Sequence, residues 1–188
     1  GIKDFEYNLL DVLNNKVRIN KAVYEYVPGY LDVLPLEEHS GDLQYDSLRS
    51  YVNEIKKDYD FVLIDISSSL NEETMAGMFA CDHIFVVTTP DHVTLASTLH
   101  AVSVAKKKKV NIEGLIINKV RGKDFELDGR EIEEMCNIPV VAVLHDDDKF
   151  LNSLDKEEAL VVLNPKSQGA LEYNKLAAAL AEQDFKDP

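Results

Sequence analysis

Four short apolar runs along the chain have the pattern of buried parallel strands. Each run is continuous, rich in Val and Ile and bounded by polar residues, as strands covered on both faces of a sheet are. The runs are FVLIDI at 61–66, HIFVVTT at 83–89, IEGLIINKV at 112–120 and IPVVAVL at 138–144. A fifth and shorter run, LDVLP at 31–35, follows a turn at Pro28-Gly29. The pattern predicts five strands, of which the four longer ones are parallel.

The segments between these strands repeat apolar residues with helical spacing. Helices are predicted at 42–58, 72–80, 92–108, 128–136, 149–156 and 167–183. Strand and helix alternate without an internal repeat or a low-complexity linker. That order predicts an α/β fold, an open and mostly parallel sheet with helices on both faces, in a single domain over residues 1–188.

Ligands bind such a sheet at the carboxyl ends of its strands. The first of these ends carries Asp65, which is followed by Ser67, Ser68 and Ser69. A carboxylate at this position can hold Mg²⁺ through water, because Mg²⁺ prefers oxygen ligands and keeps several of its waters. The same residues can instead cap the helix that begins near residue 71. Both interpretations stay open from the residues alone.

Other charged clusters are better explained by helix ends, with a cation site at the aspartates and a nucleic-acid or lipid contact at the lysines as the less favoured alternatives. The triplet Asp146-Asp147-Asp148 lies at a predicted helix start and the four lysines at 106–109 lie at a helix end, where each sign of charge favours the helix dipole. The five histidines show no zinc-binding spacing, and no G-x-S-x-G motif occurs. The sequence also contains no G-x-x-x-x-G-K-[ST] phosphate loop and no G-x-G-x-x-G motif. The strand ends therefore suit a nucleotide but lack a phosphate cradle.

Composition narrows the class of protein further. The chain has 188 residues, 45% of them hydrophobic, which is enough for a substantial core. Its net charge of -14 argues against broad attraction to nucleic acid or to an anionic membrane. The two cysteines form no C-x-x-C pair, no secretion signal is seen, and no apolar run approaches the ~20 residues of a membrane span. We therefore expect a cytoplasmic protein.

Four motifs, in one order and spacing, carry a resemblance to a known family. They are YDFVLIDISSSL, CDHIFVVTTPDHVTLAST, IEGLIINKVRG and the stretch from IPVVAVLHDDD to LNPKSQGALEYNKLAAAL. With them the chain resembles the MinD/ParA family of deviant Walker ATPases, and within it the archaeal and bacterial MinD-like proteins, over nearly its full length. The resemblance implies a three-layer fold like that of P-loop NTPases, with ATP or ADP and Mg²⁺ as ligands. Dethiobiotin-synthetase-like and metal-chaperone members of the family stay open as alternatives.

The resemblance also assigns roles to individual residues. Asp65 would close the Walker B strand and assist Mg²⁺ and catalysis, and the backbone N–H of Ser69 would meet the γ-phosphate. Asn118 and Lys119 would contact adenine, and the backbone around His145 and Asp146 would line the base pocket.

Two departures from the family pattern stand out. The family's phosphate loop, first helix and second strand precede the point where this chain begins, so we expect the C-terminal three quarters of a longer domain. The strand of that loop lies in the family between the strands at 61–66 and 83–89; without it, these two would have to close up directly or accept another segment. In addition, DISSSL replaces Asp-x-Pro-x-Gly, with Ser67 at the proline and Ser69 at the glycine.

The resemblance therefore predicts an ATP-binding switch protein in division-site placement or partitioning, and an ATPase if the native chain has the phosphate loop. It implies a nucleotide-dependent homodimer and a protein activator or cargo adaptor. Membrane contact stays open, although the sequence shows no targeting helix. Nucleic acid is not favoured as a partner. The alternative is a degenerate, non-hydrolysing member that serves as a protein-interaction module. A third interpretation, an unrelated flavodoxin-like domain, would place its ligand at other strand ends.

Overall fold

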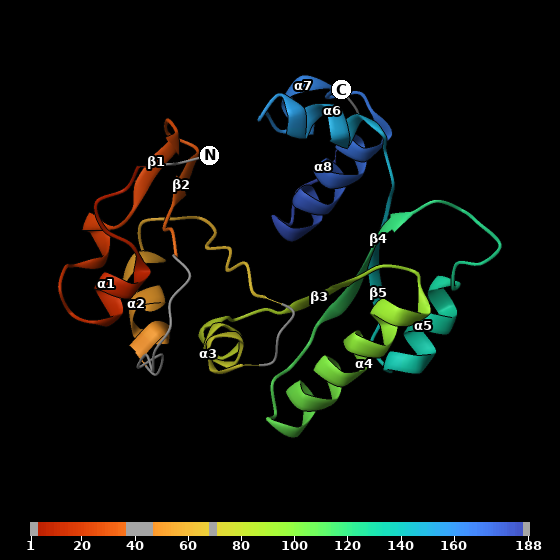
Figure 1. Cartoon of the computed structure of the whole chain (residues 1–188), viewed down its shortest axis with the longest axis horizontal. Coiled ribbons are helices and arrows are strands. Elements are labelled where there is room, and N and C mark those ends of the chain that lie inside the picture. The colour runs from red at the N-terminus through yellow and green to blue at the C-terminus, as the bar shows by residue number, and fades with distance from the viewer. Residues whose placement is uncertain (1–3, 37–46, 68–70, 186–188) are drawn as a thin grey trace. The chain divides into compact units, whose positions relative to one another are not determined.

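The computed structural model describes residues 4–36, 47–67 and 71–185 (Figure 1). The chain divides into two compact units, Gly1–Asp82 and His83–Pro188, and each is described by itself. Among the described residues, no helix is both long and apolar enough to cross a membrane.

The first unit combines short helices with a β-hairpin. It holds α1 (Leu9–Leu13), a 3-10 helix (Ile19–Lys21), β1 (Tyr24–Val27), β2 (Leu31–Val33), α2 (Leu48–Ile55) and α3 (Glu72–Ala80). β1 and β2 pair antiparallel across the turn at Pro28-Gly29, where Gly29 adopts a φ of 73°. The short strand predicted at 31–35 is thus present as β2, but as one half of a hairpin, and β1 lies outside the predicted strands.

Buried apolar residues hold the hairpin and the helices of this unit together. Val12, Ile19 and Ala22 form a core against which Tyr51 and Ile55 of α2 pack. The helix predicted at 42–58 is confirmed over the length of α2, and its residues 42–46 lie outside the described part of the chain. The helix predicted at 72–80 is confirmed as α3.

The strand predicted at 61–66 is wrong: residues 61–67 belong to no strand of the structure. Burial still alternates along them, since Val62, Ile64 and Ile66 are partly buried while Leu63 is 86% exposed. Apolar composition alone does not make a strand, because a strand also needs a neighbour whose backbone completes its hydrogen bonds. Among the described residues, no such neighbour pairs with this segment.

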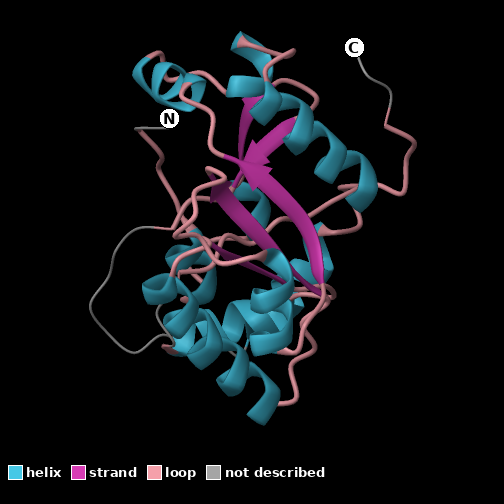
Figure 2. Ribbon diagram, turned by 90° about the vertical axis from the view of Figure 1, so that its right-hand side faces the viewer, coloured by secondary structure: helices cyan, strands magenta, loops and turns pink. Residues whose placement is uncertain are grey.

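The second unit is an α/β layer structure built on a parallel sheet. Its strands β3 (Phe85–Thr88), β4 (Gly114–Val120) and β5 (Val140–His145) lie side by side in that order (Figure 2). The helices are α4 (His92–Lys107), α5 (Gly129–Cys136), α6 (Lys149–Asp155), α7 (Leu160–Leu163) and α8 (Gln168–Leu180). The three strands predicted at 83–89, 112–120 and 138–144 are confirmed, as are the helices at 92–108, 128–136, 149–156 and 167–183. The predicted α/β fold class is thereby confirmed.

The core of this unit lies between the sheet and helices α4 and α5. Its buried residues come from α4, β4, α5 and the segment before β5. They are Leu95, Val102, Leu115, Ile117, Ile132, Cys136 and Ile138. Lys106 joins the two helices at their ends, because its Nζ donates to the carbonyl oxygens of Cys136 at 3.0 Å and Asn137 at 3.3 Å. The lysine run at 106–109 is therefore solvated only in part: its first member neutralises the carbonyl end of α5.

Gly114, the first residue of β4, leaves room for a side chain of the neighbouring strand. A Cβ at this position would lie 2.4 Å from Cγ1 and 2.7 Å from Cγ2 of Val141. These distances are far below van der Waals contact, so a residue larger than glycine would force Val141 to move. Side chains alternate along β5: Val140 packs against the core, and Val141 points to the opposite face, where it is 48% exposed.

Candidate functional site

The carboxyl end of β4 contains a β-bulge at Asn118 and Lys119. Ile117 pairs with Val143 and Val120 pairs with His145, so β4 advances by three residues while β5 advances by two. Lys119 has a φ of 60°, which is uncommon for a residue other than glycine. Such bulges commonly re-aim a side chain beside an active site. The sequence gives no local signal for this bulge, because neither residue is a glycine.

The bulge leaves the Asn118 side chain with donors to spare. Its Oδ1 accepts a hydrogen bond from the backbone N–H of Lys119 at 2.9 Å. Across the described ranges 4–36, 47–67 and 71–185, its Nδ2 donates to no protein acceptor. Asn118 is partly buried and Lys119 is exposed. An asparagine amide at a strand end, with free N–H groups, can read a flat ligand by its hydrogen-bonding edge.

The end of β5 lies beside this bulge and holds the other two predicted base-pocket residues. The backbone N–H of Asp146 donates to the carbonyl oxygen of Val120 at 2.9 Å, which joins the two strand ends. Arg121 Nε lies 2.7 Å from Asp146 Oδ2, and this ion pair raises the pKa of Arg121. The structure thus places Asn118 and Lys119 beside His145 and Asp146 at two adjacent strand ends.

Glu172 of α8 fixes the position of His145. Its carboxylate accepts from the His145 backbone N–H at 2.6 Å, lies 2.8 Å from His145 Nδ1 and accepts from Gln168 Nε2 at 3.1 Å. Burial alone would raise the pKa of the Glu172 carboxyl, but these hydrogen bonds outweigh it and hold the pKa below its ordinary value. Glu172 is absent from the predicted site residues, because 27 positions separate it from its partner.

Asp147 provides a second link between the same loop and α8. Its carboxylate accepts from the backbone N–H groups of Lys149 at 3.0 Å and Gly169 at 3.1 Å, and these bonds, with Lys149 first, lower its pKa. The triplet of aspartates is therefore not a simple helix cap. Asp148 stands at the cap position without a side-chain cap bond, while Asp146 and Asp147 each hold a partner.

The end of β3 is arranged as a helix cap. Asp91 Oδ1 accepts from the backbone N–H of Thr94 at 2.9 Å and begins α4. A hydrogen bond from the Thr89 hydroxyl, together with the bond from Thr94, lowers the pKa of Asp91 to about 2. The buried hydroxyls of Thr88 and Thr98 lie 2.9 Å apart and join β3 to α4. The TTPD motif thus has a structural role in these described residues.

Asp65 belongs to the first unit, where its side chain is exposed within the segment 61–67. Ser69 lies outside the described residues. Asn71 makes the N-cap of α3 by accepting from the Thr74 N–H at 2.9 Å, so Asp65 does not cap this helix; Ser68 and Ser69, named with it in that alternative, lie outside the described residues. In the part of the chain that the structure describes, no cluster of three or more His, Cys, Asp or Glu side chains could hold a metal. A lone carboxylate fits Mg²⁺ only when phosphate oxygens and water complete the shell.

Comparison with known proteins identifies the family. Residues 22–152, more than half of the chain, match the family model described as "AAA domain". The chain belongs to this family. It is 26% identical over 183 residues to an uncharacterized ATP-binding protein of Methanocaldococcus jannaschii, covering 96% of this chain and 69% of that protein. It is 22% identical over 183 residues to the septum site-determining protein MinD of Bacillus subtilis, covering 91% of this chain and 67% of that protein.

Solved structures agree with these sequence relatives. The cell division ATPase MinD of Pyrococcus furiosus matches with a TM-score of 0.82 and 25% identity, over 97% of this chain and 78% of that chain. The MinD protein of Pyrococcus horikoshii, solved in complex with Mg-ADP, matches with a TM-score of 0.81 and 25% identity, over 96% and 75%. The predicted membership of the MinD/ParA-like Walker ATPases and the P-loop NTPase-like fold are both confirmed.

Proposed function

We propose that this member of the family acts as an ATP-binding switch protein of the MinD/ParA kind, in division-site placement or partitioning. The observation that carries the proposal is the bulge at Asn118 and Lys119, which presents an amide with unused N–H groups at a strand end. The ion pair of Arg121 with Asp146 and the hydrogen bonds of His145 with Glu172 hold its surroundings. The names of the relatives, an ATP-binding protein and MinD proteins, support the same kind of function.

Adenine is read in this proposal by the amide of Asn118. The exocyclic amine of adenine is a donor and the adjacent ring nitrogen an acceptor, so an amide that both accepts and donates matches that edge. Oδ1 already accepts from Lys119 at 2.9 Å, but a carbonyl oxygen has a second lone pair for the adenine amine. Guanine presents the opposite pattern at that edge and would be disfavoured. Lys119 and the backbone of His145 and Asp146 form the remaining walls of the base pocket.

The family motif, read from the sequence, assigns a phosphate and Mg²⁺ role to Asp65 and Ser69. Asp65 would hold Mg²⁺ through water, with phosphate oxygens completing the shell, and the Ser69 N–H would donate to the γ-phosphate. Mg²⁺, when bound, neutralises charge that develops on the phosphates. A nucleotide-dependent homodimer and a protein activator or cargo adaptor remain part of the proposal. The MinD protein of Aquifex aeolicus was solved as a MinC:MinD complex, but at 17% identity that likeness supports the fold alone.

Nucleotide titration of the full-length native protein tests the proposal. We expect Mg²⁺-dependent ATP binding that exceeds GTP binding, and we expect Asn118→Ala to weaken ATP binding by about 1–3 kcal/mol, the usual cost of an unpaired polar group. GTP binding should change less, so that discrimination falls. Asn152→Ala, at an exposed position of α6, is the matched control. Equal loss of ATP and GTP binding in Asn118→Ala would refute the reading of adenine by this residue.

A non-hydrolysing interaction module is the second candidate. It is favoured by Ser67 at the proline position of the family motif and by the absence of strand pairing for the described residues 61–67. The two candidates differ in the same titration, since the module would bind no ATP at millimolar concentration while the switch would.

A further inference from the structure

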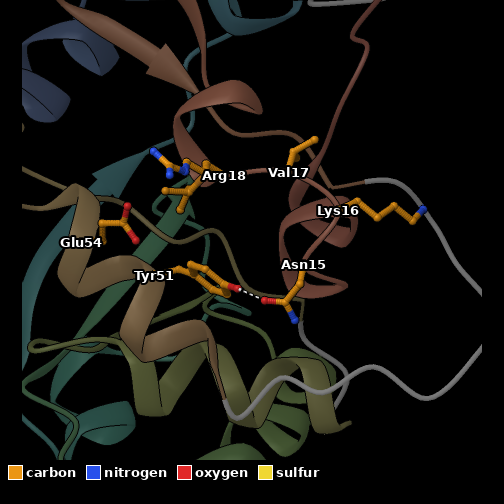
Figure 3. A pocket seen from close by; sticks show the side chains of 7 residues that line it. Asn15, Lys16, Val17, Arg18, Tyr51 and Glu54 are labelled. Atoms are coloured by element: carbon orange, nitrogen blue, oxygen red, sulfur yellow. Dashed lines mark hydrogen bonds between the residues drawn. The ribbon is translucent and has the colours of Figure 1, made fainter.

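The first unit contains a pocket of about 430 Å³ between the turn that follows α1 and helix α2. The turn contributes Asn15, Val17 and Arg18, and α2 contributes Tyr51 and Glu54 (Figure 3). Pockets of several hundred Å³ with a few well-placed polar groups are typical of small-molecule sites. All of the lining residues belong to one unit, and none is among those proposed to bind nucleotide.

Bonds within the unit fix the walls of this pocket. The Tyr51 hydroxyl donates to Asn15 Oδ1 at 3.1 Å and so joins α2 to the turn (Figure 3). Lys16 holds the other side of the turn, since its Nζ lies 2.9 Å from Asp11 Oδ1 and its backbone N–H donates to the Asp11 carbonyl at 2.9 Å. Ile19, which is 3% exposed, anchors the turn in the core. These bonds hold the backbone of the turn against α2, while the exposed side chains of Arg18 and Glu54 are left unbonded by the other described residues.

Arg18 and Glu54 bring opposite charges to the pocket without pairing with each other. Within the residues that the structure describes, neither side chain makes an ion pair or a hydrogen bond. The third charged wall residue, Lys16, is already paired with Asp11. A guanidinium offers N–H donors in one plane, which match a carboxylate, and a glutamate offers acceptors, which match an ammonium group. The pocket therefore holds one unused site for each sign of charge.

The two charges, unpaired among the described residues, restrict which ligands fit this pocket. A ligand with only a negative group would still meet Glu54, and a ligand with only a positive group would meet Arg18. A ligand that carries both groups satisfies both walls at once.

We propose that this pocket binds a free α-amino acid, with its carboxylate on Arg18 and its ammonium on Glu54. Asn15 contributes to the wall through its side-chain oxygen, which accepts from the Tyr51 hydroxyl. Val17 and the Tyr51 ring provide apolar surface for an aliphatic side chain.

Calorimetric titration of the full-length native protein with three related probes tests the proposal. The probes are L-leucine, N-acetyl-L-leucine, which lacks the ammonium, and L-leucinamide, which lacks the carboxylate. We expect L-leucine to bind roughly tenfold more tightly than either blocked probe, since each loses one charge-assisted contact. Arg18→Gln should weaken L-leucine and N-acetyl-L-leucine but not L-leucinamide. Glu54→Gln should weaken L-leucine and L-leucinamide but not N-acetyl-L-leucine.

The control is Lys57→Gln, which removes one positive charge from an exposed position outside the pocket and should leave all three affinities unchanged. Circular dichroism checks that each variant keeps the fold of the wild type. Three results would overturn the proposal: no heat with L-leucine at millimolar concentration, equal affinity for all three probes, or an unchanged probe preference in Arg18→Gln and Glu54→Gln. Equal binding of L-leucine and N-acetyl-L-leucine would show a simple anion site instead.

Discussion

Replacement of Glu172 by glutamine tests whether the end of β5 is held by a charged carboxylate. Glu172 makes two contacts to His145, at 2.6 and 2.8 Å, and its side chain is 18% exposed. Glutamine has only one acceptor oxygen. In Glu172→Gln one of the two contacts to His145 is therefore lost, and the amide NH₂ group faces the His145 atom that the second carboxylate oxygen had contacted. A hydrogen bond to a charged group contributes about 1.5–3 kcal/mol, and we expect a loss of that size in the free energy of unfolding.

Urea unfolding followed by circular dichroism measures this loss at neutral pH and at about pH 3. The folded-state pKa of Glu172 lies below its ordinary value of 4.5, so the charged carboxylate stabilises the fold above that pH. The contribution disappears as the pH falls through the lowered pKa, because the carboxyl is then protonated in both states. The gap between wild type and Glu172→Gln should therefore be large at neutral pH and small in acid.

The matched control is Glu158→Gln, which removes the same charge at an exposed position. In a chain of this size each kcal/mol shifts the melting temperature by roughly 2–4 °C, so thermal melts should separate the two variants clearly. The reasoning is refuted if Glu172→Gln unfolds like Glu158→Gln at neutral pH, or if its deficit persists undiminished in acid.

Three further predictions follow from single positions. Gly114→Ala should lower the free energy of unfolding by about 1–3 kcal/mol, because its Cβ would lie 2.4 Å from Val141. Val141→Ala in the same chain should recover most of that loss. Additive losses of the two substitutions in urea unfolding would contradict the clash. Lys106→Met should cost about 1–2 kcal/mol, because two carbonyl oxygens at the end of α5 lose their donor, whereas Lys107→Met should cost nothing measurable. If the proposed switch hydrolyses ATP, Asp65→Ala should reduce Mg²⁺-dependent hydrolysis by the full-length native protein steeply while leaving its melting temperature unchanged. Vigorous hydrolysis by the variant would remove Asp65 from the proposed site.

The strands of the second unit could be predicted because each of them pairs with another described strand. HIFVVTT, IEGLIINKV and IPVVAVL all become strands, whereas FVLIDI, with the same composition, does not. A strand forms only when two segments pair by hydrogen bonds, and an apolar run in the sequence identifies only one of the two. The helix α7, with the sequence LVVL, shows the same ambiguity in reverse, since a short apolar run does not distinguish helix from strand.

The candidate site could be predicted in part. Asn118, Lys119, His145 and Asp146 lie at adjacent strand ends, which follows from the parallel order of β4 and β5. The backbone geometry of Lys119 could not be predicted, because a φ of 60° at a lysine leaves no mark in the sequence. The contribution of Glu172 could not be predicted either, since it depends on how α8 packs along β5.

The bulge in β4 has a consequence for how this protein can change over generations. Side chains alternate between the two faces of a strand, so a substitution on the core face normally has to fit the packing of the core. The extra residue at Lys119 breaks that alternation just beyond Ile117, which is the last fully buried position of the strand. Mutations at Asn118 and Lys119 are thereby released from the packing of the sheet, whereas Val120 packs against the core again. In the proposed nucleotide site, the side chains of Asn118 and Lys119 can therefore change by mutation without a loss of stability in the sheet.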